Sequence, residues 1–310
     1  MPHSLLTSPI LLNSAQTAVR LPYESLVSEI ALLLTDAGVQ VPPRLVQALP
    51  GGGSLFVMPA LDSLVAITKL ITYTPANAGS PLPTIQGDVV VFDVATGQRK
   101  LVLDGPTVTA RRTAAVTVLA AQRLASCLQG PLLIVGAGVQ GKAHLEAFAE
   151  VLHVKEIMIA SRSAASAQAL ALHARSLGLH AQVVPDANAA LADCPLAVTC
   201  TPASGVVLDA LPRQDAFISA VGAFTPKMAE LSPLLCRHIA THGTVFADTS
   251  DAVHEAGDLL QAGLDVTRFS TLADVVRHDM RQATGPVLFK SCGWAGWDLA
   301  AARVALQHNL

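Results

Sequence analysis

The sequence predicts an α/β protein whose second half forms a Rossmann-type doubly wound parallel sheet. From Pro131 onward, short apolar runs alternate with Ala- and Leu-rich segments of helical spacing. The glycine-rich stretch 136–141 directly follows the first of these runs. Residues 1–130 lack the alternation and contain strand-like runs separated by turn signals. Together these observations predict a largely antiparallel α+β domain followed by a parallel α/β domain.

Composition excludes several classes of protein. The chain has 310 residues, 51% of them hydrophobic and 14% charged, which suffices for two modest cores and is too apolar for disorder. A net charge of −3 without a Lys/Arg run argues against nucleic acid or an anionic membrane surface as partner. The mean hydropathy is +0.48, yet no 18 consecutive residues are apolar. We therefore expect a soluble protein with a small-molecule ligand.

The N-terminal stretch MPHSLLTSPILL has no basic region ahead of its apolar residues, which argues against a secretory signal and favours the cytoplasm. The five cysteines are scattered without CxxC spacing, so we expect reduced thiols. His238 and His242 have helical i, i+4 spacing but no HExxH pattern around them. We predict no metal site.

The elements of the first half are a helix and several strands. The helix is predicted over 23–38, and strands are predicted over 54–61, 64–73 and 88–105, the last broken by the turn-like ATGQ at 95–98. A long helix is predicted over 107–125, leading into the first strand of the second domain.

The second half contains six predicted strands, at 132–135, 156–160, 181–184, 196–200, 216–221 and 244–248. Helical segments separate the first of them, among them 164–178, which stops at Gly178. This order is typical of a parallel sheet with crossover helices.

The motif GAGVQG at 136–141 lies between a buried strand and a helix, which is where a dinucleotide-binding fold needs it. Gly136, Gly138 and Gly141 would allow a tight turn, close approach of a pyrophosphate and close helix packing. We therefore predict a dinucleotide site, with Val139 and Gln140 in the same turn.

The residues after the second strand bear on the choice of cofactor. An NAD site usually carries an acidic residue there, whereas this chain has Ser161, Arg162 and Ser163. A cation and two hydroxyls suit a 2′-phosphate, so NADPH is predicted and NADH is less favoured. The alternative is an ordinary solvated arginine in a loop.

Seven segments spread along nearly the whole chain resemble the ornithine cyclodeaminase/μ-crystallin family. They are PPRLVQALP, AITKLITYTPAN, LPTIQGDVVVFDVATGQRKLVLDG, TARRTAA, VGAGVQGKAHLEA, VGAFTPKMAEL and LFKSCGWAGWDLAAA. The resemblance implies a Rossmann domain, residues 116–289, inserted into a substrate-binding and dimerisation domain made of residues 1–115 and 290–310. It also implies a homodimer.

The resemblance places ligands of a substrate carboxylate at Arg44, Lys69 and Arg112, with Thr84 lining the same pocket. The residues themselves favour Lys69, because an ammonium group in the apolar run 64–73 is costly without an anionic partner, which a ligand would provide. Arg111 and Arg112 would point about 100° apart on a helix, so one of them faces the pocket, and the family pattern selects Arg112.

The predicted cofactor contacts combine the motif residues with positions in later loops. They are Gly136, Gly138, Val139, Gln140, Gly141, Ser161, Arg162, Ser163, Thr201, Val221, Gly222 and Ser291. The resemblance places Lys290, Ser291 and Asp298 in a C-terminal helix that returns towards the cofactor. For Asp298, packing is the favoured interpretation.

One departure from the family pattern bears on the reaction. Cyclodeaminases of the family carry an acid shortly after VG, and Phe224 stands in its place here. A phenyl ring cannot transfer a proton, which removes help worth about 10²- to 10⁴-fold. We therefore expect an NADPH-dependent imine reductase acting on Δ1-pyrroline-2-carboxylate and Δ1-piperideine-2-carboxylate, with Lys69 as the catalytic residue.

Several alternatives remain open. The chain could be an NADP-dependent amino acid dehydrogenase, an ornithine cyclodeaminase, or a non-catalytic binding protein like some crystallins. The sequence also leaves the choice between five- and six-membered rings open, because one methylene in an apolar pocket is worth only about 1–3 kcal/mol.

Overall fold

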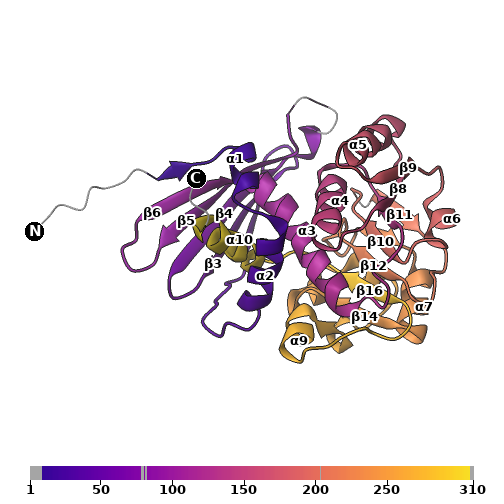
Figure 1. Cartoon of the computed structure of the whole chain (residues 1–310). Helices are drawn as coiled ribbons and strands as arrows, with labels where there is room; N and C mark the ends of the chain where they lie inside the picture. The colour runs from indigo at the N-terminus through magenta and orange to yellow at the C-terminus, as the bar shows by residue number, and fades with distance from the viewer. Residues whose placement is uncertain (1–8, 78–79, 81, 203, 308–310) are drawn as a thin grey trace, which may run out of the picture. The chain divides into compact units, whose positions relative to one another are not determined.

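The computed structural model describes residues 9–77, 80, 82–202 and 204–307 (Figure 1). Residues 1–8, on which the prediction about a secretory signal depends, lie outside the described residues. The chain divides into two compact units, unit 1 (Met1–Arg112 and Trp294–Leu310) and unit 2 (Thr113–Gly293). The sequence predicts domain boundaries after residues 115 and 289. The boundaries between the two units of the structure follow residues 112 and 293.

Within the described residues, unit 1 contains a six-stranded sheet of order β1-β6-β5-β4-β3-β2. Its strands are β1 Ile10–Leu11, β2 Leu45–Ala48, β3 Ser54–Leu61, β4 Val65–Tyr73, β5 Ile85–Asp93 and β6 Arg99–Asp104. Pairing from β2 to β6 is antiparallel, as the sequence predicts, whereas β1 pairs parallel with β6.

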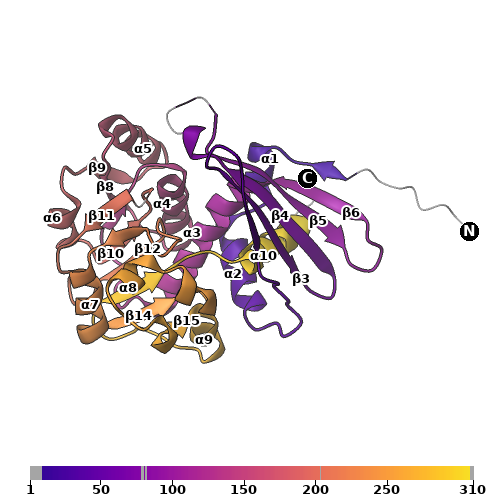
Figure 2. The same cartoon turned by 180° about the vertical axis from the view of Figure 1, so that it is seen from behind.

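Helices cover one face of this sheet. Unit 1 contains α1 Ser14–Val19, α2 Tyr23–Leu33, η1 Pro75–Asn77, the first part of α3 Gly105–Leu124, and α10 Ala295–Gln307. Helix α10 contacts β3, β4, β5 and α2, and Figure 2 shows it lying across these strands. On β4 the residues facing this layer, Val65, Ile67, Lys69 and Ile71, are all buried. The period-2 alternation of the strand therefore places Lys69 in a row of apolar side chains.

The helix predicted over 23–38 is shorter in the structure, since α2 ends at Leu33. Residues after it form turns, and the Asp36 side chain accepts a hydrogen bond from the backbone N–H of Gly38 (2.8 Å). Asp and Gly favour such a turn over continued helix.

The described part of unit 2 contains an eight-stranded parallel sheet of order β15-β14-β16-β12-β10-β7-β8-β9. Its strands are β7 Leu132–Val135, β8 Glu156–Ala160, β9 His180–Val183, β10 Leu196–Thr199, β12 Phe217–Ala220, β14 Thr244–Ala247, β15 Ser270–Thr271 and β16 Val287–Lys290. The strand order reverses at β7, whose neighbours are β8 and β10. The doubly wound parallel sheet predicted from the sequence is thus confirmed.

Helices and a small second sheet complete unit 2. The helices are α4 Val139–Val151, α5 Ala164–Ser176, α6 Ala187–Leu191, α7 Pro233–His242, η2 Ser250–His254, α8 Gly257–Gln261, η3 Val266–Arg268 and α9 Leu272–Arg277. The second sheet pairs β11 Ser204–Leu208 with β13 Ala229–Leu231. No helix in the described part of the chain combines the length and apolar character needed to cross a membrane.

The prediction that Lys290 and Ser291 belong to the C-terminal helix is wrong. Lys290 ends β16, a strand between β12 and β14, and Ser291 directly follows it. Helix α10 begins four residues later, at Ala295. The apolar run Val287–Phe289 is fully buried between two parallel neighbours, which explains why it reads as a buried helix as well as a strand.

Candidate active site

A buried cluster of two cations and one carboxylate lies in unit 1. Lys69 of β4 and Arg112 of α3 both form ion pairs with Asp298 of α10. The Lys69 Nζ atom is 2.7 Å from Asp298 Oδ2, and Arg112 Nε is 3.2 Å from Oδ1. Asp298 is completely buried, and Lys69 and Arg112 are 1% and 5% exposed. Three segments far apart in the sequence thus bring these charges together.

Burial lowers the pKa of Lys69 from 10.5 to about 8. The negative charge of Asp298 raises this pKa, whereas the positive charges of Arg112 and Arg44 lower it further. A group with a pKa near 8 can both hold and release a proton close to neutral pH. Lys69 is therefore suited to act as a proton donor.

Arg44 and Thr84 occupy different places along the sheet. Arg44 is half-buried directly before β2 and is close enough to lower the pKa of Lys69 by its charge. Thr84 lies directly before β5, where its carbonyl accepts a hydrogen bond from the N–H of Thr74. Because Lys69 pairs with Val89, Thr84 is five residues from Lys69 along the strand.

Arg111 and Arg112 point in different directions, as expected for consecutive residues of a helix. The Arg111 Nε atom donates to the carbonyl of Leu21 (2.7 Å), and its guanidinium lies over the ring of Tyr23 at 3.8 Å. Of the two arginines, Arg112 is the one that pairs with Asp298.

Asp298 is the residue of this cluster that sequence reasoning undervalued. The sequence favours a packing role for Asp298, whereas the structure makes it the shared ion-pair partner of Lys69 and Arg112, two of the three predicted cations. The sequence contains a signal for this role, because Asp298 interrupts an apolar helical run just as Lys69 interrupts an apolar strand. A buried charge in either context requires a partner.

The glycine turn of unit 2 has the form that a bound pyrophosphate requires. Gly136 has a φ of +114°, and a Cβ there would lie 2.7 Å from the carbonyl oxygen of Cys200. A Cβ on Gly141 would clash with the carbonyl of Gly136. Helix α4 begins after Gly138 without a side-chain cap, so its first N–H groups are available to an anion. The Gln140 Oε1 atom is buried and has no hydrogen-bond partner among the residues that the structure describes, which also fits a bound group.

The residues after β8 form the N-terminus of another helix. Arg162 is exposed, and Ser163 is the N-cap of α5, where its side chain accepts from the N–H of Ser166 (3.2 Å). The Ser161 hydroxyl accepts from the N–H of Ser163 (3.3 Å). Arg162 therefore stands beside a helix N-terminus, where an anion is favoured.

The remaining predicted cofactor residues follow three neighbouring strands of unit 2. Thr201 follows β10, Val221 and Gly222 follow β12, and Ser291 follows β16. The Ser291 hydroxyl is buried and donates to Asp248 Oδ2 (3.0 Å). Because the strands are parallel, these loops share the carboxyl edge of the sheet with the glycine turn.

Comparison with known proteins places this arrangement in a family. The sequence profile of the ornithine cyclodeaminase/mu-crystallin family matches residues 21–309. The chain belongs to this family. It is 38% identical over 301 residues to Delta(1)-pyrroline-2-carboxylate reductase 2 of Burkholderia ambifaria, covering 94% of each chain. It is also 38% identical over 307 residues to the Delta(1)-pyrroline-2-carboxylate/Delta(1)-piperideine-2-carboxylate reductase of Azospirillum brasilense, covering 96% of each.

A solved structure shows the same fold. The Delta(1)-pyrroline-2-carboxylate reductase of Thermococcus litoralis, in complex with NADH and L-proline, superposes with a TM-score of 0.84. The match covers 97% of both chains at 22% sequence identity. The two chains therefore share one fold over nearly their full lengths.

Phe224 occupies the position at which the family resemblance implies an acid in cyclodeaminases. It follows β12 and is 36% exposed. Nothing in a phenyl side chain can replace the proton transfer that the acid would supply.

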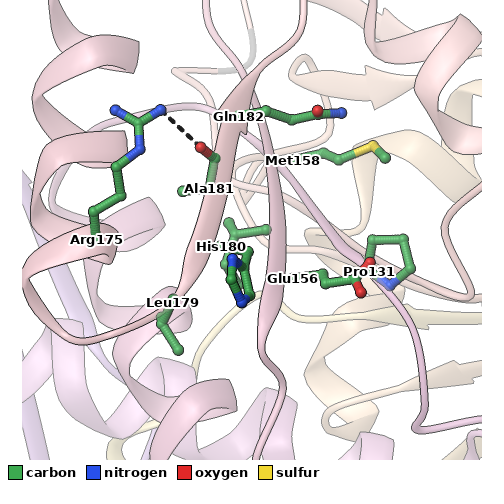
Figure 3. A pocket seen from close by; sticks show the side chains of 9 residues that line it. Pro131, Glu156, Met158, Arg175, Leu179, His180, Ala181 and Gln182 are labelled. Atoms are coloured by element: carbon green, nitrogen blue, oxygen red, sulfur yellow. Dashed lines mark hydrogen bonds between the residues drawn. The ribbon is translucent and has the colours of Figure 1, made fainter.

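A pocket elsewhere in unit 2 holds none of the residues predicted for this family's site (Figure 3). It is lined by Pro131, Glu156, Ile157, Met158, Arg175, Leu179, His180, Ala181 and Gln182. Figure 3 shows Arg175 directed towards the carbonyl of Ala181, to which it donates a hydrogen bond (2.8 Å). Its lining includes Glu156 at the amino end of β8, whereas the glycine turn lies at the carboxyl edge of the parallel sheet.

Proposed function

We propose that the protein reduces the cyclic imines Δ1-pyrroline-2-carboxylate and Δ1-piperideine-2-carboxylate to L-proline and L-pipecolate with NADPH. The observation that carries the proposal is the buried cluster in unit 1, where Lys69 and Arg112 share Asp298. Two cations beside one carboxylate leave a positive charge that suits an anionic substrate. The names of the relatives at 38% identity support the same reaction.

In this proposal unit 1 binds the imino acid. Arg44 and Arg112 hold its carboxylate, because guanidinium groups suit the geometry of a carboxylate. Lys69 keeps the ring nitrogen protonated, directly or through water, and its lowered pKa suits that role. Protonation makes C2 more electrophilic. The product amine gains one hydride at C2 and one proton at nitrogen.

Unit 2 holds the dinucleotide, with the pyrophosphate at the glycine turn and the N-terminus of α4. NADPH supplies the hydride that reduces C2 of the imine. Arg162, exposed at the N-terminus of α5, pairs with the 2′-phosphate and favours NADPH over NADH. A cytoplasmic location, where such nucleotides are available, belongs to the proposal.

The sheet of unit 1 supports a homodimer. One of its faces carries Val57, Leu70, Val90 and Phe92, which register places on the side of the strands opposite Lys69. We call these four residues the open face. None of them is buried, and Leu70 is 44% exposed. An apolar sheet face of this kind is suited to pack against a second copy.

A substrate panel tests the proposed reaction. NADPH oxidation is followed with both cyclic imines and with pyruvate plus ammonia, and ammonia release is measured with ornithine and the oxidised cofactor. We expect turnover of the cyclic imines and no ammonia release from ornithine. Ammonia release from ornithine, or a higher kcat/KM with pyruvate and ammonia than with either cyclic imine, would contradict the proposal.

A further inference from the structure

Unit 2 contains a buried carboxylate, that of Glu230, under the loops at the carboxyl edge of its parallel sheet. Glu230 belongs to β13 and is completely buried. Its Oε1 atom accepts from the N–H (2.6 Å) and the hydroxyl (2.9 Å) of Thr201. Its Oε2 atom accepts from the N–H of Gly222 (2.6 Å) and the hydroxyl of Thr199 (2.9 Å). One side chain thus connects the ends of β10 and β12.

A buried ion pair holds Glu230 in place. The Asp258 Oδ1 atom accepts from the backbone N–H groups of Glu230 (2.6 Å) and Leu231 (2.9 Å). Its Oδ2 atom pairs with Lys290 Nζ at 2.9 Å. Lys290 also donates to the carbonyls of Ala220 (3.1 Å) and Ala223 (2.5 Å), on either side of Gly222. The segment 220–223 is therefore fixed from both sides.

The backbone of Gly222 packs so closely against the Glu230 carboxylate that a larger residue would not fit at position 222. A Cβ at Gly222 would lie 2.5 Å from Glu230 Oε1. A buried carboxylate with four donors is stabilised by them, and replacing it leaves those donors without acceptors. The position of the Gly222 backbone thus depends directly on this carboxylate.

The location of these loops indicates which part of the dinucleotide they serve. In a doubly wound sheet the dinucleotide spans the point where the strand order reverses, with its adenosine ribose beside the second strand. Here the second strand is β8, followed by Arg162. Thr201 and Gly222 follow β10 and β12, on the other side of β7. They lie where the nicotinamide half belongs.

We infer that Glu230 is a positioning residue that fixes Thr201 and Gly222 for the nicotinamide half of the dinucleotide. The inference rests on the proposed function, because it needs a bound dinucleotide. It assigns no direct contact between Glu230 and the nucleotide. The effect passes through the backbone N–H groups that Glu230 holds.

The test compares the affinity of Glu230→Gln for the whole dinucleotide with its affinity for a ligand that represents the adenosine half alone. A glutamine has one acceptor oxygen, so its NH₂ group faces either the Thr201 N–H or the Gly222 N–H. NADPH and adenosine 2′,5′-bisphosphate are titrated by calorimetry, the second as a probe of the adenosine half. We expect the Kd of NADPH to rise about tenfold or more, as for loss of a charge-assisted hydrogen bond, and the Kd of the bisphosphate to stay within about twofold.

Two further variants separate positioning from folding. Glu29→Gln removes a carboxylate of α2 that is 8% exposed and pairs with Arg303, and it should leave both Kd values unchanged. Thr199→Val removes one donor to Glu230 and should raise the Kd of NADPH by a smaller factor in the same direction. If Glu230→Gln weakens both ligands equally, or neither, the inference is wrong. If Glu230→Gln fails to fold, an unchanged NADPH Kd in Thr199→Val overturns the inference.

These titrations involve no imine. Failure of the proposed reaction would appear as intact NADPH binding without turnover of the cyclic imines. Failure of the inference about Glu230 would appear differently. The wild-type protein would reduce the cyclic imines, but Glu230→Gln would change the Kd values of NADPH and of the bisphosphate by the same factor. The two failures are therefore distinguishable.

Discussion

At the scale of single residues, the proposed chemistry of unit 1 depends on a buried cluster in which two cations share one carboxylate. Lys69 is costly to bury, and Asp298 offsets part of that cost. The remaining positive charge of Lys69 and Arg112 would be neutralised by the substrate carboxylate. Ligand binding would thus complete an ion-pair network that is incomplete without it.

Sequence reasoning could find Lys69, because a charge in an apolar strand stands out. It could not find the pairing with Asp298, because the two residues are 229 positions apart and only the packing of α10 on β4 brings them together. Choosing Arg112 over Arg111 needed the family pattern, since helical geometry says only that the two diverge.

The lowered pKa of Lys69 predicts the pH dependence of the reaction. The protonated form is the active one, so kcat/KM should fall as the pH rises through about 8. Asp298 raises the pKa of Lys69, so Asp298→Asn should move this fall to a lower pH. In Lys69→Arg, kcat/KM should be lower at every pH, because guanidinium is a poor proton donor, and the fall should disappear below pH 10, since guanidinium stays charged. The measurement is the pH profile of kcat/KM, and an alkaline limb that stays in place in both variants would assign it to the substrate instead.

Removing the guanidinium of Arg112 should weaken the substrate clamp. Arg112→Ala loses a charge-assisted hydrogen bond of about 1.5–3 kcal/mol, so kcat/KM for the cyclic imines should fall about 10- to 150-fold. The Kd of NADPH should stay unchanged. Arg111→Ala is the matched control, because Arg111 contacts Leu21 and Tyr23 instead. Unaltered kinetics in Arg112→Ala would remove this residue from the site.

At the scale of elements, strands were predictable where a long apolar or alternating run is bounded by turn residues. β3, β4, β7 and β8 are such strands, and their observed bounds lie within one residue of the predicted ones. β15 has two residues and gives no signal. β16 is a short apolar run whose partners, β12 and β14, lie far away in the sequence, so its pairing could not be predicted locally.

The loop between β8 and α5 carries the prediction about cofactor choice. Arg162→Asp should shift preference from NADPH towards NADH, because it replaces a cation that would face the 2′-phosphate with a repelling anion. The lost contact is worth about 1.5–3 kcal/mol, or roughly 10- to 150-fold in the ratio of kcat/KM values. The ratio is measured under identical conditions for the wild type, Arg162→Asp and Lys155→Asp, a control directly before β8. An unchanged ratio in Arg162→Asp would show that Arg162 is an ordinary solvated side chain.

At the scale of the whole molecule, two units with different sheets divide the proposed work. The antiparallel sheet of unit 1 has a helical layer on one side, where Lys69 lies, and the open face on the other. In the proposed function, the same strands would present a substrate group on one face and an association surface on the other. Alternation along each strand makes this division possible.

This division predicts the state of association. Light scattering should give about twice the chain mass of 32.1 kDa at micromolar concentration. Leu70→Lys, on the open face, should shift the protein towards monomer, because it places a charge in an apolar contact. Leu172→Lys is the control, since Leu172 is 63% exposed on α5 in unit 2. A wild type that is monomeric and fully active would rule out the open face as a functional interface.

The most direct test of the central claim follows the hydride itself. The protein is incubated with Δ1-pyrroline-2-carboxylate and NADPH deuterated at C4, in separate reactions for each of the two C4 positions, and the product is analysed by NMR. We predict that the product is L-proline and that deuterium from one of the two labelled cofactors appears at C2. Lys69→Met should form the same product much more slowly. Absence of proline, or proline without deuterium at C2 from either cofactor, would contradict the proposed reaction.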